Sequence, residues 1–334
     1  MSKKDVSDYI KEFIDRAKEL EGCSEFFNEY GSDFWSFKKL IFLAHYIRPF
    51  LDISIKNNYQ PIYIDACAGC GINSIKKENV AVKFIGSPLI SIIYGIHHIK
   101  KRNENNKFLK WFFVEKEDYY IELEKRIDAL SKNIEMENNI KIENGKDVEI
   151  LHGNFNDKID EIINYINDNY KNKISVLVFV DPYSFSEIDW NTIEKLYDKL
   201  KAVDLIYCFS SGTLKRALDS CSDEKLKKVL PPSLKDKSRG ELSLMPEEAF
   251  EEAFAEDIVN AARRSITYFG KGITTRNRVN TELYRIMFFT HLKQIAVKNI
   301  TERICDDLNP LTAKELETIT ECVIGKAKNL KQFI

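Results

Sequence analysis

Five short apolar stretches of the chain each end in a polar side chain that could bind a ligand or take part in a reaction. These side chains are Asp65, Glu115, Asn154, Asp181 and Ser210. The first is followed by a turn that contains Gly69 and Gly71, and glycine lets a backbone bend tightly beside a ligand. Carboxylates accept hydrogen bonds from hydroxyl and ammonium groups. A buried strand that ends in a carboxylate and a glycine turn predicts a nucleotide-like ligand.

The hydrophobic pattern predicts the elements that must position these side chains. Strand-like runs lie at residues 62–65, 111–115, 148–151, 174–180 and 204–209, with helical patterns between them. This alternation predicts an α/β fold with a doubly wound, mostly parallel sheet, whose strands end together at one edge. Residues 72–85, between the glycine turn and the next helix, are predicted to be irregular. Strand-like runs at 266–279 and 283–290 predict a terminal antiparallel hairpin, which brings the sheet to seven strands.

Four segments of one domain are expected from this pattern. They are an N-terminal helical extension (1–57), an α/β core (58–210), a basic insertion with a helix (211–265), and the terminal hairpin with a helical tail (266–334). Apolar residues recur at helical spacing over 4–22 and 34–53, so the extension is predicted to be a pair of amphipathic helices. Lys38 and Lys39 are expected on the polar face of the second helix.

Composition limits the class of protein. The 334 residues carry a net charge of −2, so a nucleic-acid surface must be local, and basic residues do gather between Lys215 and Arg239. No run approaches roughly 18 uncharged apolar residues, so no membrane segment is expected. Seven scattered cysteines and no signal peptide indicate a reducing cytoplasm. Cys67 and Cys70 have no second cysteine pair to complete a zinc site, so buried thiols and no metal are predicted.

The first turn distinguishes between two kinds of nucleotide-like ligand. A dinucleotide site needs the pattern Gly-x-Gly-x-x-Gly, whose third glycine brings a helix N-terminus to the pyrophosphate, and this chain lacks it. S-adenosylmethionine (SAM) has no phosphate and needs carboxylates for its ammonium group and its ribose hydroxyls. Asp65 suits the ammonium group and Glu115 suits the ribose, while Asn154 and Phe155 suit the adenine. The cofactor predicted from these residues is SAM.

The fourth strand is followed by Asp181-Pro182-Tyr183, which resembles the Asp-Pro-Pro-Tyr motif of amino-group methyltransferases but is one proline short. The amine of a nucleobase is a poor nucleophile because its lone pair is delocalised into the ring. An acceptor such as Asp181 can orient its protons, Pro182 can fix the turn, and Tyr183 can stack on the ring. Simpler interpretations remain open: Glu115 and Asn154 can be helix caps, and Asp181-Pro182 can be a helix-start turn.

Several motifs together resemble the three-Cys-motif partner family. They are Lys39-Leu-Ile-Phe-Leu-Ala-His-Tyr-Ile, Tyr63-Ile-Asp-Ala-Cys-Ala-Gly-Cys-Gly, Gly86-Ser-Pro-Leu, Phe113-Val-Glu, Gly153-Asn-Phe-Asn, and Phe179-Val-Asp-Pro-Tyr-Ser-Phe followed by Trp190. The resemblance implies a class I SAM-dependent methyltransferase-like fold and a separate partner protein that carries a three-cysteine motif. The chain departs from the family at Cys67 and Cys70, and at Asn154, where aspartate is common.

Two functions of different classes are therefore expected. The first is SAM-dependent N-methylation of a nucleic-acid base, with RNA or DNA contacting residues 215–239. The alternative is a non-catalytic or accessory partner that docks a three-cysteine metalloprotein. A nuclease-like enzyme is the least favoured, because no short motif pairs carboxylates for metal ions.

Overall fold

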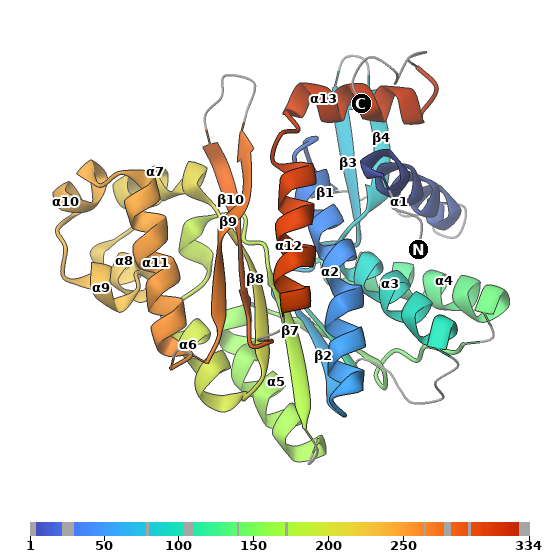
Figure 1. The fold of residues 1–334 in the computed structure, drawn as a ribbon, viewed down its shortest axis with the longest axis horizontal. Coiled ribbons are helices and arrows are strands. Elements are labelled where there is room, and N and C mark those ends of the chain that lie inside the picture. The colour runs from blue at the N-terminus through green and yellow to red at the C-terminus, as the bar shows by residue number, and fades with distance from the viewer. Residues whose placement is uncertain are drawn as a thin grey trace.

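A seven-stranded sheet forms the centre of the computed structural model, which describes residues 5–21, 30–77, 80–102, 110–138, 140–170, 173–263, 265–276, 282–292 and 295–326 (Figure 1). Its strands are β2 (Gln60–Asp65), β5 (Lys110–Glu115), β6 (Val148–His152), β7 (Ile174–Val180), β8 (Val203–Phe209), β9 (Thr267–Arg276) and β10 (Glu282–Thr290). The spatial order is β6-β5-β2-β7-β8-β10-β9. The first five are parallel, whereas β10 is antiparallel to both β8 and β9. The predicted Rossmann-like fold class with its terminal hairpin is confirmed.

Helices cover both faces of this sheet. The helices α2 (Ser36–Lys56), α3 (Ser87–Arg102), α4 (Tyr119–Asn138) and α12 (Ile295–Leu308) lie on one face, and α5 (Phe155–Asn169), α6 (Trp190–Lys199) and α11 (Glu247–Ala261) lie on the other. Strand β7 shows how one sequence supplies both cores. Its Val176 and Val178 join one hydrophobic cluster, while Leu177 and Phe179 join the other. Side chains of a strand alternate between faces, so a strand buried on both sides is apolar throughout.

The segment predicted to be irregular is instead a small second sheet. Strands β3 (Ile72–Lys77) and β4 (Val80–Ile85) pair antiparallel, and β1 (Tyr30–Gly31) pairs parallel to β3. The prediction of an irregular segment was wrong because lysines interrupt the apolar pattern of two short strands. Alternate residues of these strands are nevertheless buried, for example Val80, Val82 and Phe84. Helices α1 (Val6–Glu21) and α13 (Ala313–Val323) pack against β4, so both ends of the chain contribute to this part.

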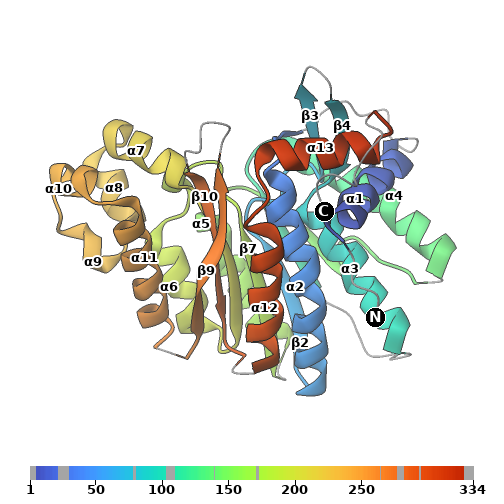
Figure 2. The same cartoon turned by 45° about the horizontal axis from the view of Figure 1, so that its top comes forward.

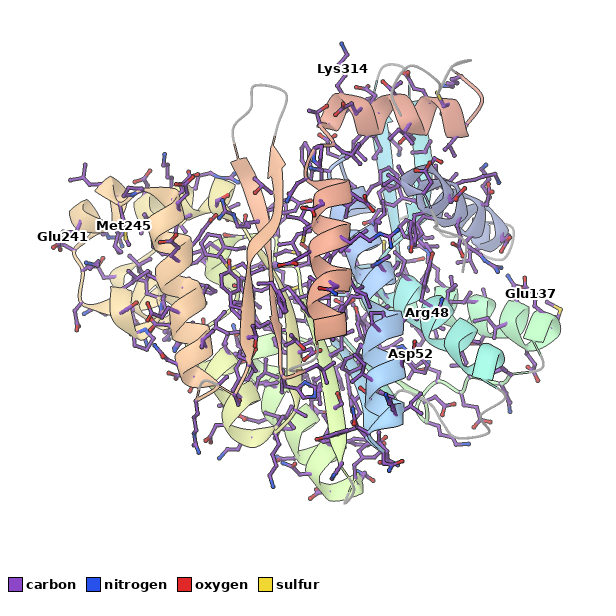
Figure 3. All side chains as sticks on the ribbon, viewed as in Figure 1. Arg48, Asp52, Glu137, Glu241, Met245 and Lys314 are labelled. Atoms are coloured by element: carbon purple, nitrogen blue, oxygen red, sulfur yellow. The ribbon has the colours of Figure 1, made fainter. Side chains whose placement is uncertain are left out.

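The basic insertion contains four short helices before α11. They are α7 (Ser211–Ser220), α8 (Asp223–Val229), α9 (Pro232–Lys235) and α10 (Arg239–Leu244). Leu226, Leu234 and Leu242 bury their side chains in the same cluster as α11. Figure 2 shows the insertion on the opposite side of the β9–β10 hairpin from α1 and α13, and in Figure 3 Glu241 and Met245 lie at the outer edge of the insertion.

Two further expectations concern the surface of the molecule. Residues 277–279, the end of the first strand-like run of the predicted hairpin, lie outside the described residues. Among the residues that are described, no helix is both long and apolar enough to cross a membrane.

Candidate functional site

A cavity of about 700 Å³ lies at the carboxyl ends of the parallel strands, the edge at which open α/β sheets bind ligands. Of the predicted site residues, all but Asp65 line this cavity. The lining residues are Gly69, Gly71, Glu115, Asn154, Phe155, Asp181, Pro182 and Tyr183. Ser210, after the fifth parallel strand, also lines it. Five separate strand ends thus bring these residues to one cavity. Parallel neighbouring strands end at the same edge of a sheet, which places the five strand ends close together.

Glu115 connects its own strand end to the glycine turn. Its Oε2 accepts a hydrogen bond from the backbone N–H of Gly69 at 2.6 Å, and its Oε1 accepts one from Glu117 at 2.9 Å. Burial raises the pKa of this carboxyl group, while the two backbone bonds act in the opposite direction. Each carboxylate oxygen has two acceptor positions, so the side chain has one position left on each oxygen for a ligand hydroxyl.

The two turn glycines are needed for different reasons. Both have left-handed backbone, with φ of +63° at Gly69 and +81° at Gly71, but only a Cβ at Gly71 meets a neighbour, the Leu123 side chain at 3.0 Å. We expect Gly69→Ala to lower the free energy of unfolding by about 1–2 kcal/mol from backbone strain. Gly71→Ala adds a steric cost, about 2–5 kcal/mol in total. Urea denaturation of the matched pair measures this, and equal losses would contradict the steric contribution.

Asp65 lies beneath the cavity and not on its surface. Its side chain is fully buried and accepts hydrogen bonds from the Tyr63 hydroxyl at 3.2 Å and the Cys67 N–H at 3.4 Å. Burial raises its pKa to about 7, although Ser87, a cavity residue, hydrogen bonds to it and lowers the pKa. The Asp65 carboxylate does not line the cavity, whereas Ser87, which hydrogen bonds to it, does. Binding of a ligand ammonium group by Asp65 stays a prediction.

The raised pKa of Asp65 predicts a pH-dependent stability. Between its unfolded value of 3.8 and about 7, the folded protein binds this proton more tightly than the unfolded chain. Stability from this group is therefore present at low pH and is lost as the pH rises through about 7, by at most about 4 kcal/mol. We expect Asp65→Asn to gain stability over the wild type between pH 5 and pH 8 in urea titrations. The exposed control Asp236→Asn is expected to follow the wild type, and a constant difference at both pH values would disprove the assignment.

Asn154 and Phe155 begin helix α5 at the cavity wall. The Asn154 side chain caps the helix, because its Oδ1 accepts from the Asn156 N–H at 2.9 Å. The simpler cap interpretation thus applies to this oxygen, while the amide nitrogen faces no hydrogen-bond partner among the described residues. The Phe155 side chain is only 2% exposed and packs in the core. Phe155 can therefore offer a ligand its backbone rather than the face of its ring.

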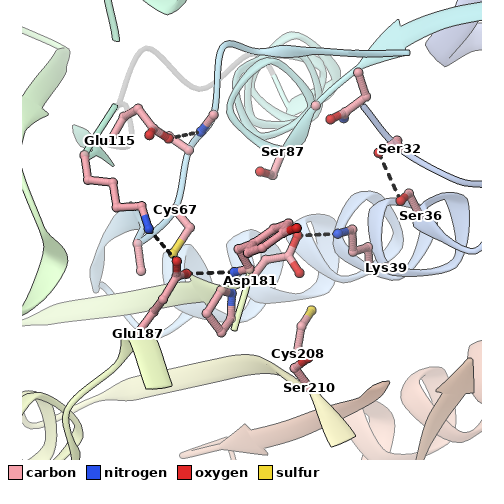
Figure 4. Close-up of a pocket in the computed structure, with 18 of the residues that line it drawn as sticks. Ser32, Ser36, Lys39, Cys67, Ser87, Glu115, Asp181, Glu187, Cys208 and Ser210 are labelled. Atoms are coloured by element: carbon pink, nitrogen blue, oxygen red, sulfur yellow. Dashed lines mark hydrogen bonds and ion pairs between the residues drawn. The ribbon is translucent and has the colours of Figure 1, made fainter. Parts of the chain in front are cut away.

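Asp181 forms an ion pair that the sequence did not predict. Lys39 Nζ lies 2.5 Å from Asp181 Oδ2, although 142 residues separate them (Figure 4). The expectation that Lys38 and Lys39 lie on a polar helix face was wrong. Lys38 is buried and donates to the Thr274 carbonyl at 3.2 Å, and Lys39 points into the cavity. Helix α2 is covered on this side by the hairpin and α12, which an isolated helical pattern does not reveal.

The rest of the Asp181-Pro182-Tyr183 turn is held by Glu187. The Tyr183 N–H donates to Glu187 Oε2 at 2.7 Å, and Lys116 pairs with the other oxygen of that carboxylate. Pro182 is buried, whereas the Tyr183 side chain is 73% exposed at the cavity rim. An exposed ring beside Asp181 can stack on a planar ligand. The sequence did not indicate Lys116 and Glu187 as cavity residues. Their positions depend on contacts between different loops, which no local pattern reveals.

Three cysteines border the cavity. Cys70 is buried and donates to the Ile72 carbonyl at 3.1 Å, and Cys67 and Cys208 line the cavity wall. Burial raises the pKa of both Cys67 and Cys208 well above the usual range, with nearby carboxylates adding to the effect. Cys67 and Cys208 are therefore neutral thiols. No group of three or more metal-binding side chains occurs in the described part of the chain.

Many cations of the basic insertion are already paired within the protein. Lys225 bonds Asp189 at 2.8 Å, Lys228 bonds Glu224 at 3.0 Å, and Arg239 bonds Asp223 at 2.7 Å. Arg216 differs, because it lines the cavity, is exposed, and has no ion-pair partner in the described ranges. In the described part of the insertion, Arg216 is the cation that lines the cavity. Contact of residues 215–239 with RNA or DNA stays a prediction.

Comparison with known proteins identifies only loose structural likeness. No family model matches the chain, and no curated protein matches it. A Legionella pneumophila protein described by the family model DUF519 superposes with a TM-score of 0.45 at 12% identity, covering 82% of this chain and 94% of that one. The plantazolicin methyltransferase BamL, solved with a triazolic desmethylPZN analog and SAH, gives 0.35 at 11% identity, covering 98% and 93%. The fold assignment rests on the strand order, and membership of the three-Cys-motif partner family stays a prediction.

Proposed function

We propose that the protein is a SAM-dependent methyltransferase that methylates the exocyclic amine of a nucleic-acid base. The observation that carries this proposal is the composition of one cavity. Glycine-turn, carboxylate and amide groups line one part of it, and Asp181, Pro182 and Tyr183 line another. The volume of about 700 Å³ is within the usual range for a small-molecule site.

The part of the cavity lined by the glycine turn, Glu115 and Asn154, here called the cofactor part, has hydrogen-bond donors and acceptors that suit SAM. The free acceptor positions of Glu115 suit the two ribose hydroxyls, and the amide nitrogen of Asn154 suits a ring nitrogen of adenine. Ser87, supported by Asp65 from below, offers a hydroxyl near the glycine turn for the amino-acid part. SAM supplies a methyl group bound to a sulfonium, and its transfer needs no metal ion.

The part lined by Asp181, Pro182 and Tyr183, here called the acceptor part because it would hold the methyl acceptor, suits an aromatic amine. Asp181 accepts a hydrogen bond from the amine, which turns the nitrogen lone pair away from the ring and towards the methyl carbon. The nitrogen–carbon bond forms as the carbon–sulfur bond breaks, and the bonding pair stays on sulfur. The extra proton on nitrogen then passes through Asp181 to water. Catalysis is mainly positioning, which can supply a large part of the rate.

The nucleic-acid part of the proposal rests on the rim. Tyr183 exposes its ring there, and stacking on aromatic side chains is the usual way to hold an unpaired base. Arg216 lies at the same rim and can contact a phosphate. Base access also requires an unpaired or flipped nucleotide, since the cavity cannot admit a duplex.

Calorimetric titration with SAM tests the foundation of this proposal. We expect the wild type to bind SAM and S-adenosylhomocysteine, and Glu115→Gln to bind SAM about 10- to 100-fold more weakly, because a charged acceptor for two hydroxyls is lost. Glutamine keeps one oxygen for the Gly69 N–H, so the turn should survive. The exposed variant Glu241→Gln serves as the control. Absence of SAM binding by the wild type would contradict the methyltransferase proposal and favour the accessory-partner alternative.

A further inference from the structure

Lys39 is the least expected group in the acceptor part of the cavity. Its Nζ lies 2.5 Å from Asp181 Oδ2 and 5.6 Å from the centre of the Tyr284 ring. The side chains of Lys39 and Asp181 are 17% and 22% exposed, so water screens the pair only in part. Figure 4 shows Lys39 extending from α2 towards Asp181.

The position of Lys39 is fixed by the backbone around it. Ser32 Oγ and Ser36 Oγ are 3.1 Å apart at the start of α2, and the Ser32 N–H donates to the Ser74 carbonyl of the small sheet at 2.8 Å. The Tyr284 hydroxyl donates to the Trp35 carbonyl at 3.1 Å. The helix end that carries Lys39 is therefore tied to both the small sheet and β10, and the ammonium group is preorganised beside Asp181.

The charge state of Lys39 is also defined. Burial acts to lower its pKa, but Asp181 and the other acidic neighbours outweigh burial and raise it. Lys39 is thus an ammonium ion at neutral pH, and it offsets the charge of Asp181. A second ammonium ion at Asp181 would meet a like charge within a partly dehydrated cavity, where such repulsion is strong.

We propose that Lys39 is a specificity residue that restricts the acceptor to a neutral aromatic amine with a ring-nitrogen acceptor beside it, as in adenine or cytosine. This inference rests on the proposed methyltransferase function. Asp181 Oδ1 accepts from the amine N–H, while a Lys39 N–H donates to the adjacent ring nitrogen. The Lys39–Asp181 pair therefore matches a donor–acceptor edge of a base and rejects the ammonium groups of lysine side chains and polyamines.

Binding measurements, without any methyl transfer, can distinguish neutral aromatic amines from ammonium groups as ligands of this site. Spermidine and the single-stranded oligonucleotides dA12 and dT12 are titrated separately into the full-length wild type, Lys39→Met and Lys39→Arg. Lys39→Met removes the positive charge and keeps the length of the side chain, whereas Lys39→Arg keeps the charge. We expect Lys39→Met to bind spermidine at least tenfold more tightly than the wild type, since Asp181 becomes available, and Lys39→Arg to exclude spermidine as the wild type does. The preference for dA12 over dT12 should fall at least fivefold in Lys39→Met.

Equal spermidine binding by the wild type and Lys39→Met would overturn the proposal, and so would an unchanged dA12-to-dT12 ratio. If Lys39 had only a structural role, its replacement would weaken the binding of spermidine and of both oligonucleotides alike. It would not raise the affinity for spermidine while lowering the preference for dA12. If Lys39→Met fails to fold, Lys39→Gln replaces it with the same expectations. Failure of the proposed function has a different signature, because the wild type would then bind no SAM, while the spermidine comparison reports on Lys39 alone.

Discussion

Replacing Asp181 by asparagine is expected to lower methyl transfer to an oligonucleotide by at least about 100-fold, the usual size of a lost positioning or acid–base group. The asparagine keeps one oxygen, but it loses the negative charge that orients the amine and takes its proton. It also leaves the Lys39 ammonium group, now 2.5 Å from a carboxylate oxygen, without a counter-ion. Transfer of a labelled methyl group from SAM to single-stranded DNA or RNA measures the effect.

The matching control lies on the same loop. Asp189→Asn makes the same chemical change at a residue that bonds Lys225 at 2.8 Å outside the cavity lining, and it should keep the wild-type rate within about threefold. SAM affinity should stay within a similar factor in both variants, because the cofactor groups are untouched. If the Asp181→Asn protein methylates as fast as the wild type, Asp181 has no catalytic role and Asp181-Pro182 serves only as a turn.

Replacing Asp204 by alanine is expected to lower the free energy of unfolding by about 3–5 kcal/mol, the usual effect of breaking a buried polar network. Asp204 is fully buried at the start of β8 and accepts hydrogen bonds from three donors. These are the Tyr46 hydroxyl, the His291 N–H at 2.8 Å and His291 Nδ1 at 2.7 Å. One carboxylate thus joins α2, β8 and the end of β10, and its loss leaves the donors buried without an acceptor.

Urea denaturation with a graded control measures this contribution. Tyr46→Phe removes one donor and leaves the carboxylate, so about 1–2 kcal/mol is expected. Because Asp204 lies at the amino end of its strand, away from the cavity, SAM affinity of the folded Asp204→Ala protein should equal that of the wild type. A loss below that of Tyr46→Phe would show that the network contributes little to stability.

The site could be predicted as far as local sequence determines geometry. Apolar runs such as 174–180 are buried on both faces and form parallel strands, and parallel strands must end at the same edge. That rule alone brings Glu115, Asn154 and Asp181 to one cavity. The small sheet was missed because its strands are short and lysines break their pattern, so no period was long enough to recognise.

By itself the sequence determined the element order, the sheet class and the residues at the strand ends, because hydrophobic periodicity and glycine turns act over a few residues. Only the tertiary structure decided which of those residues line the cavity. Asp65 follows the strand pattern yet lies under the cavity, held by Tyr63 and Cys67. Lys39 follows a helix pattern yet pairs with Asp181 across 142 residues. Contacts between distant segments depend on how whole elements pack, and no short stretch of the chain contains that information.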